Sequence, residues 1–348
     1  MLELLSELLR IAIADESYSG TRLTDMPKKD ANAWDTALNE TRAHRVTPLL
    51  GYMLRSTRMD RAVPAPFDTA FANDYRQTLV ANTQLAHTLE QVIPALSESD
   101  IKPIVLKGAL LADAYYPDLG TRPMGDIDLL IQAEELDVAL QIFGAMGFTP
   151  HSDHTGEDAT KLCNSRGITI DLHDRFTLFP PDMRDGVTEE ASMRCLAGQP
   201  VKCWEPNAQL VHVLVHQYGH RPLSGLILGW LLDLAFIVRR DGERLCPKRI
   251  EDLMPDSQQL KMLWRALGFL SKHAGLVIPS QLRGAVESEP TLRLPGILRD
   301  QRLARWGLPS TRGWLRLLAC HLHLKSPPTS KYPSMSDLAH CLRSSGRD

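Results

Sequence analysis

The stretch Arg122-Pro123-Met124-Gly125-Asp126-Ile127-Asp128-Leu129-Leu130-Ile131 decides the fold of the middle of the chain. Pro123 and Gly125 indicate a loop, and the alternation of polar and apolar residues that begins at Asp126 is typical of a strand. Side chains two residues apart on a strand point to the same face, which brings Asp126 and Asp128 together. The sequence therefore predicts two neighbouring carboxylates at the beginning of a strand.

A second strand and two helices are predicted around this stretch. The apolar run at residues 104–106 predicts a short strand, which ends at Lys107-Gly108. Residues 109–116 and 134–146 have the spacing of helices. One strand therefore leads into a helix ahead of the two acids, and another helix follows the acids.

A hairpin is predicted further along, where Asn164-Ser165-Arg166-Gly167 has the composition of a turn. It would join strands at residues 160–163 and 168–173. Asp171 lies in the second strand between two apolar neighbours. Taken alone, Asp171 is equally well explained as a strand-end acid that makes a turn or capping hydrogen bond. Together with the other two acids, it is a third carboxylate for one site.

Helical spacing returns on both sides of this α/β region. A long helix is predicted at residues 71–93, and further helices at residues 207–218, 223–240, 260–274 and 314–324. We therefore predict an α+β fold in four parts, namely a helical N-terminal unit at 1–99, an α/β core at 100–205, a helical domain at 206–325 and a polar tail at 326–348.

Composition restricts the class of protein. The chain has 348 residues, of which 43% are hydrophobic, and this is enough apolar material for a sizeable core. The 39 basic and 42 acidic residues give a net charge of −3, so binding to nucleic acid is not expected. Six scattered cysteines and the lack of a long uncharged apolar stretch favour a cytoplasmic protein with reduced thiols and no membrane span.

Two carboxylates held side by side repel each other, and a divalent cation relieves that repulsion. Oxygen ligands suit Mg²⁺ or Mn²⁺, and the Mg²⁺ shell is often completed by water and the phosphates of a substrate. A DxD sequence also arises by chance, but here both acids adjoin apolar residues, and buried acids need partners. Asp126, Asp128 and Asp171 are therefore candidate metal ligands. The same repulsion predicts that Asp128→Asn leaves the stability of the metal-free protein unchanged or raises it.

Lys107, Gly108 and Arg122 are candidate phosphate-binding residues. A glycine at the junction of a strand and a helix lets a phosphate approach the helix N-terminus. Arg122 could donate two hydrogen bonds to a phosphate, although a surface loop arginine is the simpler explanation of Arg122 alone. The chain has neither a Walker A loop nor a GxGxxG sequence after a strand.

These residues occur in an order that resembles a known family. The combination looks like the bacterial uncharacterised nucleotidyltransferase family of the DNA polymerase β-like superfamily. It consists of Leu106-Lys107-Gly108-Ala109-Leu110-Leu111, Tyr115-Tyr116-Pro117, residues 122–131 and Ile170-Asp171-Leu172-His173. The resemblance extends to His216, His220, Trp230, Leu231, Asp233 and Trp34 and to residues 46–50, so that it covers residues 1–310 approximately.

The resemblance implies a small mixed, twisted β-sheet core flanked by helical units. It also implies that a nucleoside monophosphate passes from an NTP to an acceptor hydroxyl, that Asp126 and Asp128 bridge two Mg²⁺ ions, and that Asp171 binds the ion that activates the acceptor. The superfamily usually has Gly-Ser after the first strand, where this chain has Lys107-Gly108. Lys107 is therefore expected to replace the serine as a phosphate contact.

Four histidines are candidates for roles in the predicted site. His173 shares a strand face with Asp171, where it is expected to contact substrate or to orient that acid. His212, His216 and His220 recur at helical spacing, which is one pattern of a zinc site, but the glutamate of HExxH is absent. We favour His216 and His220 as residues that border the active-site cleft and contact the nucleotide or the acceptor.

The leading interpretation is a Mg²⁺-dependent nucleotidyltransferase that acts on a small molecule, a peptide or a protein. One alternative is a nucleotide-binding or scaffold protein that keeps the fold without turnover. Another is a toxin-like enzyme that modifies tRNA, which the net charge disfavours. The presence of all three acids favours an enzyme over a scaffold, because a scaffold does not require them.

Overall fold

The computed structural model describes residues 2–13, 31–156, 159–175, 191–220, 227–254, 256–293 and 297. In this part of the chain, helices surround a seven-stranded mixed sheet with the order β3-β4-β5-β2-β1-β7-β6. The strands are β1 (Ile104–Val105), β2 (Ile127–Leu130), β3 (Phe148–Gly156), β4 (Ala159–Asn164), β5 (Thr169–His173), β6 (Ser192–Leu196) and β7 (Gln199–Cys203). The structure thus confirms the predicted α+β class with a mixed sheet.

The centre of the sheet contains the strands that the sequence predicts. β4 and β5 form the expected antiparallel hairpin, with Asn164 accepting the turn hydrogen bond from the Gly167 amide at 3.0 Å. β2 pairs with β5 in parallel and with β1 in antiparallel orientation. All four residues of β2 are buried, and β2 lies between β1 and β5 with α6 in contact with it.

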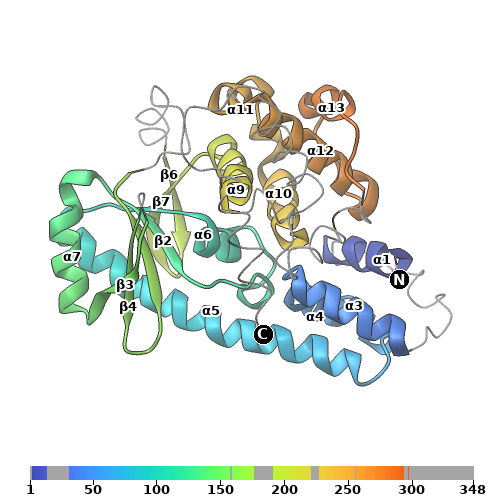
Figure 1. Ribbon diagram of the computed structural model, residues 1–348, viewed down its shortest axis with the longest axis horizontal. Helices are drawn as coiled ribbons and strands as arrows, with labels where there is room; N and C mark the ends of the chain where they lie inside the picture. Colours follow the sequence, from blue (N-terminus) through green and yellow to red (C-terminus); the bar gives the residue numbers. More distant parts are fainter. Residues whose placement is uncertain are drawn as a thin grey trace, which may run out of the picture.

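Helices lie around the sheet, and one of them extends along most of the molecule (Figure 1). They are α1 (Leu2–Ala12), α3 (Ala31–Ala43), α4 (Thr47–Ser56), α5 (Phe67–Ser97), α6 (Lys107–Ala114), α7 (Leu136–Ala145), α9 (Pro206–His220), α10 (Leu228–Asp241), α11 (Pro247–Leu253), α12 (Ser257–Ala274) and α13 (Ser280–Glu287). The long helix α5 contacts α3 and α4 toward one end, and α7 and β7 toward the other. Helices α9 to α13 gather on the opposite side of the molecule from α7 (Figure 1).

The sequence did not indicate β3 or the hairpin of β6 and β7. The two-residue turn of that hairpin is Ala197-Gly198, and both residues have positive φ, at 46° and 72°. This is the backbone of a tight primed turn, which usually carries asparagine or aspartate before the glycine. Alanine in that position explains why the pattern gave no turn signal. The predicted helix at 314–324 and the tail at 326–348 lie outside the described residues.

One apolar core joins the helical and sheet-containing parts of the chain. It extends without interruption from Leu8 on α1 through Val105 on β1 to Leu263 on α12. The core therefore crosses the boundaries at 99 and 205, and the division into separate units stays a prediction. In the described part of the chain, every helix is too short or too polar to cross a membrane.

Candidate active site

The sheet places two of the three predicted acids side by side on adjacent strands. Asp128 lies on β2 directly beside Asp171 on β5, because the two residues are partners in the parallel register. Register partners on neighbouring strands project from the same face. Asp126 comes immediately before β2 and two residues before Asp128, so it is expected on that face as well. The pairing results from the hairpin, which returns β5 alongside β2.

Asp128 is a buried anion with two cationic or polar partners. Lys107 Nζ lies 2.8 Å from Asp128 Oδ1, and His173 Nε2 lies 3.4 Å from the same oxygen. Burial acts to raise the pKa of the Asp128 carboxyl, but Lys107 and His173 together hold it well below its ordinary range. Asp128 is therefore ionised, and His173 contacts Asp128 rather than only its strand neighbour Asp171.

Asp126 has the opposite electrostatic environment. Burial, and after it the negative charges of Asp128 and Asp171, raise the pKa of its carboxyl to about 6. Lys107 and Lys161 lower the pKa, but their effect is smaller. The negative charge of Asp126 is therefore opposed by its surroundings, whereas that of Asp128 is favoured.

Asp171 contributes an oxygen that has no hydrogen-bond donor. Its Oδ1 is buried without a hydrogen-bond partner, and Lys161 Nζ approaches it only to 3.7 Å. Lys161 is the register partner of Asp171 in the β4–β5 hairpin. The sequence analysis missed Lys161, although its position opposite Asp171 across the predicted turn was a usable signal.

The oxygen atoms of the three acids have the chemistry that hard divalent cations prefer. Among the described residues, no three Asp, Glu, His or Cys side chains lie close enough to surround an ion by themselves. The Asp171 oxygen without a hydrogen bond and the raised pKa of Asp126 nevertheless favour a cation at this place. Mg²⁺ commonly takes one or two carboxylates and completes its shell with water and phosphate oxygens. The carboxylates are thus compatible with Mg²⁺ or Mn²⁺ that binds together with a nucleotide.

Helix α6 begins beside the acids, two residues before the predicted start at Ala109. Its first two residues are Lys107 and Gly108, and the amide of the preceding Leu106 donates a hydrogen bond to the carbonyl of Asp128 at 3.0 Å. A Cβ atom placed on Gly108 would lie 3.4 Å from Arg122 Nη1, which is an ordinary contact. The glycine is therefore not required by close packing within the protein, and its absent side chain leaves room at the helix N-terminus.

Arg122 is bound to another part of the protein. Its Nε and Nη2 donate to the two carboxylate oxygens of Asp233 on α10, at 2.8 and 2.9 Å. The Tyr116 hydroxyl also donates to Asp233, at 2.7 Å. The two guanidinium hydrogen bonds that were predicted to bind a phosphate are thus donated to Asp233. Only Nη1 is directed toward Gly108.

The loop that leads into Asp126 is attached to helix α5. Asn82 is fully buried, and its side-chain amide donates to the carbonyls of Leu119 and Arg122, at 2.5 and 2.8 Å. Its side-chain oxygen accepts from the Met124 amide at 3.3 Å. Asn82 therefore fixes three backbone groups just ahead of the acids. The sequence analysis missed this residue, because a single asparagine within a helical pattern has no distinguishing signal.

The histidines of α9 differ in their surroundings. His212 is buried, with its ring 4.6 Å from that of Trp204 and 6.0 Å from that of His216. Burial lowers the pKa of His212 well below its ordinary value, and the charge of Lys107 lowers it further. His212 is thus a neutral residue close to the acids. The side chain of His220 lies outside the described residues.

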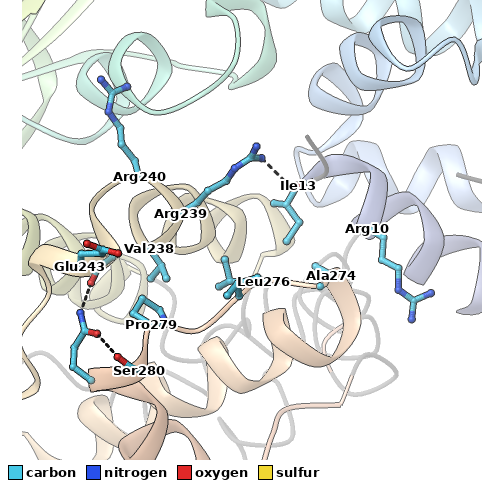
Figure 2. Close-up of a pocket in the computed structure, with 14 residues that line it drawn as sticks. Arg10, Ile13, Val238, Arg239, Arg240, Glu243, Ala274, Leu276, Pro279 and Ser280 are labelled. Carbon is cyan, nitrogen blue, oxygen red and sulfur yellow. Dashed lines mark hydrogen bonds between the residues drawn. The ribbon is translucent and has the colours of Figure 1, made fainter. Parts of the chain in front are cut away.

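A separate cavity of about 940 Å³ lies between α1, α10 and α12 (Figure 2). It is lined by residues such as Ile13, Leu276 and Arg239, and none of the three acids belongs to its wall. Arg239 Nη1 donates to the Ile13 carbonyl at 3.0 Å, so this arginine already has a partner (Figure 2). The chemistry of the acids therefore does not depend on this cavity.

The mixed sheet and its three acids agree with the class of protein that the sequence predicts, the nucleotidyltransferases. The chain belongs to the uncharacterised nucleotidyltransferase family, which it matches over residues 30–275. No match occurs among curated proteins.

Several solved structures are similar to parts of the chain. ANT(2″)-Ia in complex with adenylyl-2″-tobramycin has 17% identity and a TM-score of 0.38, over 49% of this chain and 94% of that chain. The lincosamide antibiotic adenylyltransferase LnuA, bound to lincomycin, has 15% identity and a TM-score of 0.27, over 35% of this chain and 82% of that chain. An antigenic nucleotidyltransferase-like protein from Paracoccidioides brasiliensis has 18% identity and a TM-score of 0.34, over 63% of this chain and 95% of that chain.

Proposed function

We propose that this chain is an enzyme that uses Mg²⁺ or Mn²⁺ to transfer a nucleoside monophosphate from an NTP to an acceptor hydroxyl. The acceptor would be a small molecule, a peptide or a protein. The observation that carries this proposal is the register pairing of Asp128 with Asp171 on parallel strands. Asp126 precedes Asp128 by two residues. Membership of the nucleotidyltransferase family supports the class of reaction.

In the proposed reaction, Asp126 and Asp128 would hold two divalent ions, and Asp171 would hold the one that activates the acceptor. Such ions neutralise charge on the triphosphate and lower the pKa of the acceptor hydroxyl. The acceptor oxygen bonds to the α-phosphorus while the bond from that phosphorus to the β-phosphate oxygen breaks, and pyrophosphate leaves. The hydroxyl proton passes to the Asp171 carboxylate, whose Oδ1 has no hydrogen bond.

Other residues of the site would bind and orient the nucleotide. Lys107 supplies a point charge for phosphate, and Gly108 leaves room for a phosphate at the N-terminus of α6. Arg122 adds positive charge through Nη1, which lies close to Gly108, while its Nε and Nη2 stay hydrogen-bonded to Asp233. His173 would orient Asp128, and His216 and His220 would contact the nucleotide or the acceptor.

A labelling experiment tests the proposal. Extract of the host cell is incubated with the protein, Mg²⁺ and each NTP labelled at the α-phosphate. We expect label on an extract component with the wild type and none with Asp128→Asn or Asp171→Asn. Asp137→Asn, at an exposed position on α7, is the matched control and should label normally.

Three outcomes separate the alternatives. Label on a small molecule, peptide or protein supports the proposal. Label on tRNA would support the toxin-like alternative. No labelled product with any NTP, from a wild-type protein that still binds nucleotide, would support the scaffold alternative. Full transfer by Asp128→Asn would show that the assignment of the acids is wrong.

A further inference from the structure

Lys107 combines an unusual backbone with a buried ion pair. Its φ is +35°, although it is not a glycine and begins helix α6. Positive φ is costly for a residue with a Cβ atom and is found where other interactions impose it, often at functional sites. The interaction present here is the 2.8 Å contact from Lys107 Nζ to Asp128 Oδ1. Lys107 is thus distinguished both by its backbone conformation and by its buried ion pair.

Water has little access to this ion pair. The Lys107 side chain is 12% exposed and that of Asp128 is 4% exposed. An ammonium is strongly hydrated, so its burial requires a close anion in return. The carboxylate of Asp128 supplies that anion, and His173 is the second group at the same oxygen. In the metal-free protein, the charge of Asp128 is therefore already balanced by a cation of the chain itself.

We propose that Lys107 is a tethered cation that takes the place of a divalent ion at Asp128 until a nucleotide arrives. This inference rests on the proposed function, in which Asp128 is a metal ligand. A divalent ion and the ammonium cannot share the Asp128 oxygens at small separation, because two positive charges repel strongly where water is excluded. Metal binding at Asp128 therefore requires that the Lys107 ammonium move away.

The triphosphate provides the new partner for that ammonium. Without nucleotide, a released Lys107 would lose its anion and stay partly buried, which opposes metal binding. With nucleotide, phosphate oxygens beside α6 can accept the ammonium while they also complete the shell of the metal. Lys107 thus makes metal and nucleotide bind together, and it limits metal binding in the absence of substrate.

Titration with Mn²⁺ alone, followed by electron paramagnetic resonance of the free ion, tests this role. Lys107→Met keeps the length and apolar stem of the side chain and removes the charge. We expect it to bind Mn²⁺ about tenfold more tightly than the wild type in the absence of nucleotide, because the competing charge is gone. Lys102→Met is the control, since Lys102 is exposed and pairs with Asp100 at 2.9 Å. It should bind Mn²⁺ as the wild type does.

A second titration contains a non-hydrolysable NTP analogue. The analogue should strengthen Mn²⁺ binding to the wild type by a larger factor than binding to Lys107→Met. Circular dichroism establishes that the variant is folded, and Lys107→Gln replaces it if it is not. Equal or weaker Mn²⁺ affinity in the folded variant would overturn the role of Lys107. So would a wild type whose Mn²⁺ affinity does not change when nucleotide is added.

The two proposals can fail separately. A wild type that follows the expected Mn²⁺ pattern but transfers no nucleotide to any acceptor contradicts the proposed function and leaves the tethered cation supported. A wild type that transfers nucleotide, with unchanged Mn²⁺ affinity in Lys107→Met, contradicts only the tethered cation.

Discussion

At the scale of single residues, the three acids differ in what surrounds them. Asp128 is paired with Lys107 at 2.8 Å, Asp126 has a pKa raised to about 6, and Asp171 has a buried oxygen without a hydrogen bond. Strand alternation predicted that the acids share a face, but it carried no information on which acid would be neutralised. That difference comes from Lys107, whose side chain reaches back to β2 from the start of α6.

Asp126 should destabilise the metal-free protein at neutral pH. Its folded-state pKa is about 6 against an ordinary 3.8, so the folded protein holds this proton more tightly than the unfolded chain. The more tightly held proton stabilises the folded state fully below about pH 4, and this stabilisation is lost as the pH rises through about 6. With chelator present, Asp126→Asn should therefore be more stable than the wild type at pH 8, by at most about 3 kcal/mol, and equally stable at pH 4.

Urea denaturation at the two pH values measures this difference. The Asp137→Asn variant should differ from the wild type by less than about 1 kcal/mol at either pH, because Asp137 is exposed and interacts with the N-terminus of α7. A stability gain of Asp126→Asn that is the same at pH 4 and pH 8 would contradict the electrostatic explanation.

Asp128→Asn should have the opposite effect on stability. The sequence alone suggested that this substitution would relieve repulsion, but the ion pair with Lys107 leads to a different expectation. Loss of one partner leaves the other charge buried, and we expect a cost of roughly 3 kcal/mol in metal-free buffer. Thermal or urea denaturation measures this loss of stability, with Asp137→Asn again as the control. A melting temperature equal to or above that of the wild type would show that the sequence-based expectation was right.

At the scale of elements, the hairpin and the long helix position the acids. The apolar runs and the turn at Asn164 were enough to predict β1, β2, β4 and β5. The loop ahead of Asp126 was predicted only as a loop, because its conformation depends on Asn82 of α5, far away in the sequence. Long-range contacts of this kind leave no local pattern for a sequence to reveal. The β6–β7 hairpin was missed for the separate reason that its turn begins with Ala197.

Asn82→Ala should weaken both the fold and the metal site. It removes the partners of two carbonyls and one amide in the loop that precedes Asp126, at an expected cost of about 2–3 kcal/mol in stability. The loop should then hold Asp126 less firmly, and Mn²⁺ affinity should fall several-fold. Asn73→Ala on the exposed side of the same helix should change stability by less than about 0.5 kcal/mol. If Asn82→Ala lost stability but kept full Mn²⁺ affinity, Asn82 would serve the fold alone.

At the scale of the whole molecule, two consecutive tyrosines join α6 to α10. Tyr115 donates to Asp241 at 2.8 Å, and Tyr116 donates to Asp233 at 2.7 Å. Each of these acids also pairs with an arginine of the sheet-containing part, Arg194 and Arg122 respectively. The C-terminal helices are thus joined to the core by two buried polar clusters as well as by apolar packing. The sequence analysis named Asp233 but had no means of finding its partner 111 residues earlier.

Asp233→Asn should therefore be strongly destabilising. Arg122 would stay buried without its carboxylate, which typically costs about 3–5 kcal/mol. Asp252→Asn is a suitable control, because Asp252 is exposed and pairs with Lys248 on the surface. Its loss should cost less than about 1 kcal/mol. Urea denaturation of both variants measures these costs, and equal effects would contradict the importance of the buried pair.

Nucleotide binding with and without a divalent ion tests the central claim most directly. Three clustered carboxylates repel a triphosphate until a cation neutralises them. Calorimetric titration of the wild type with a non-hydrolysable NTP should therefore show binding in Mg²⁺ or Mn²⁺, and none when the metal is replaced by chelator. The same titration of Asp171→Asn should show weakened binding in the presence of metal. Equal nucleotide affinity with metal and with chelator would contradict the assignment of Asp126, Asp128 and Asp171 as a metal-dependent active site.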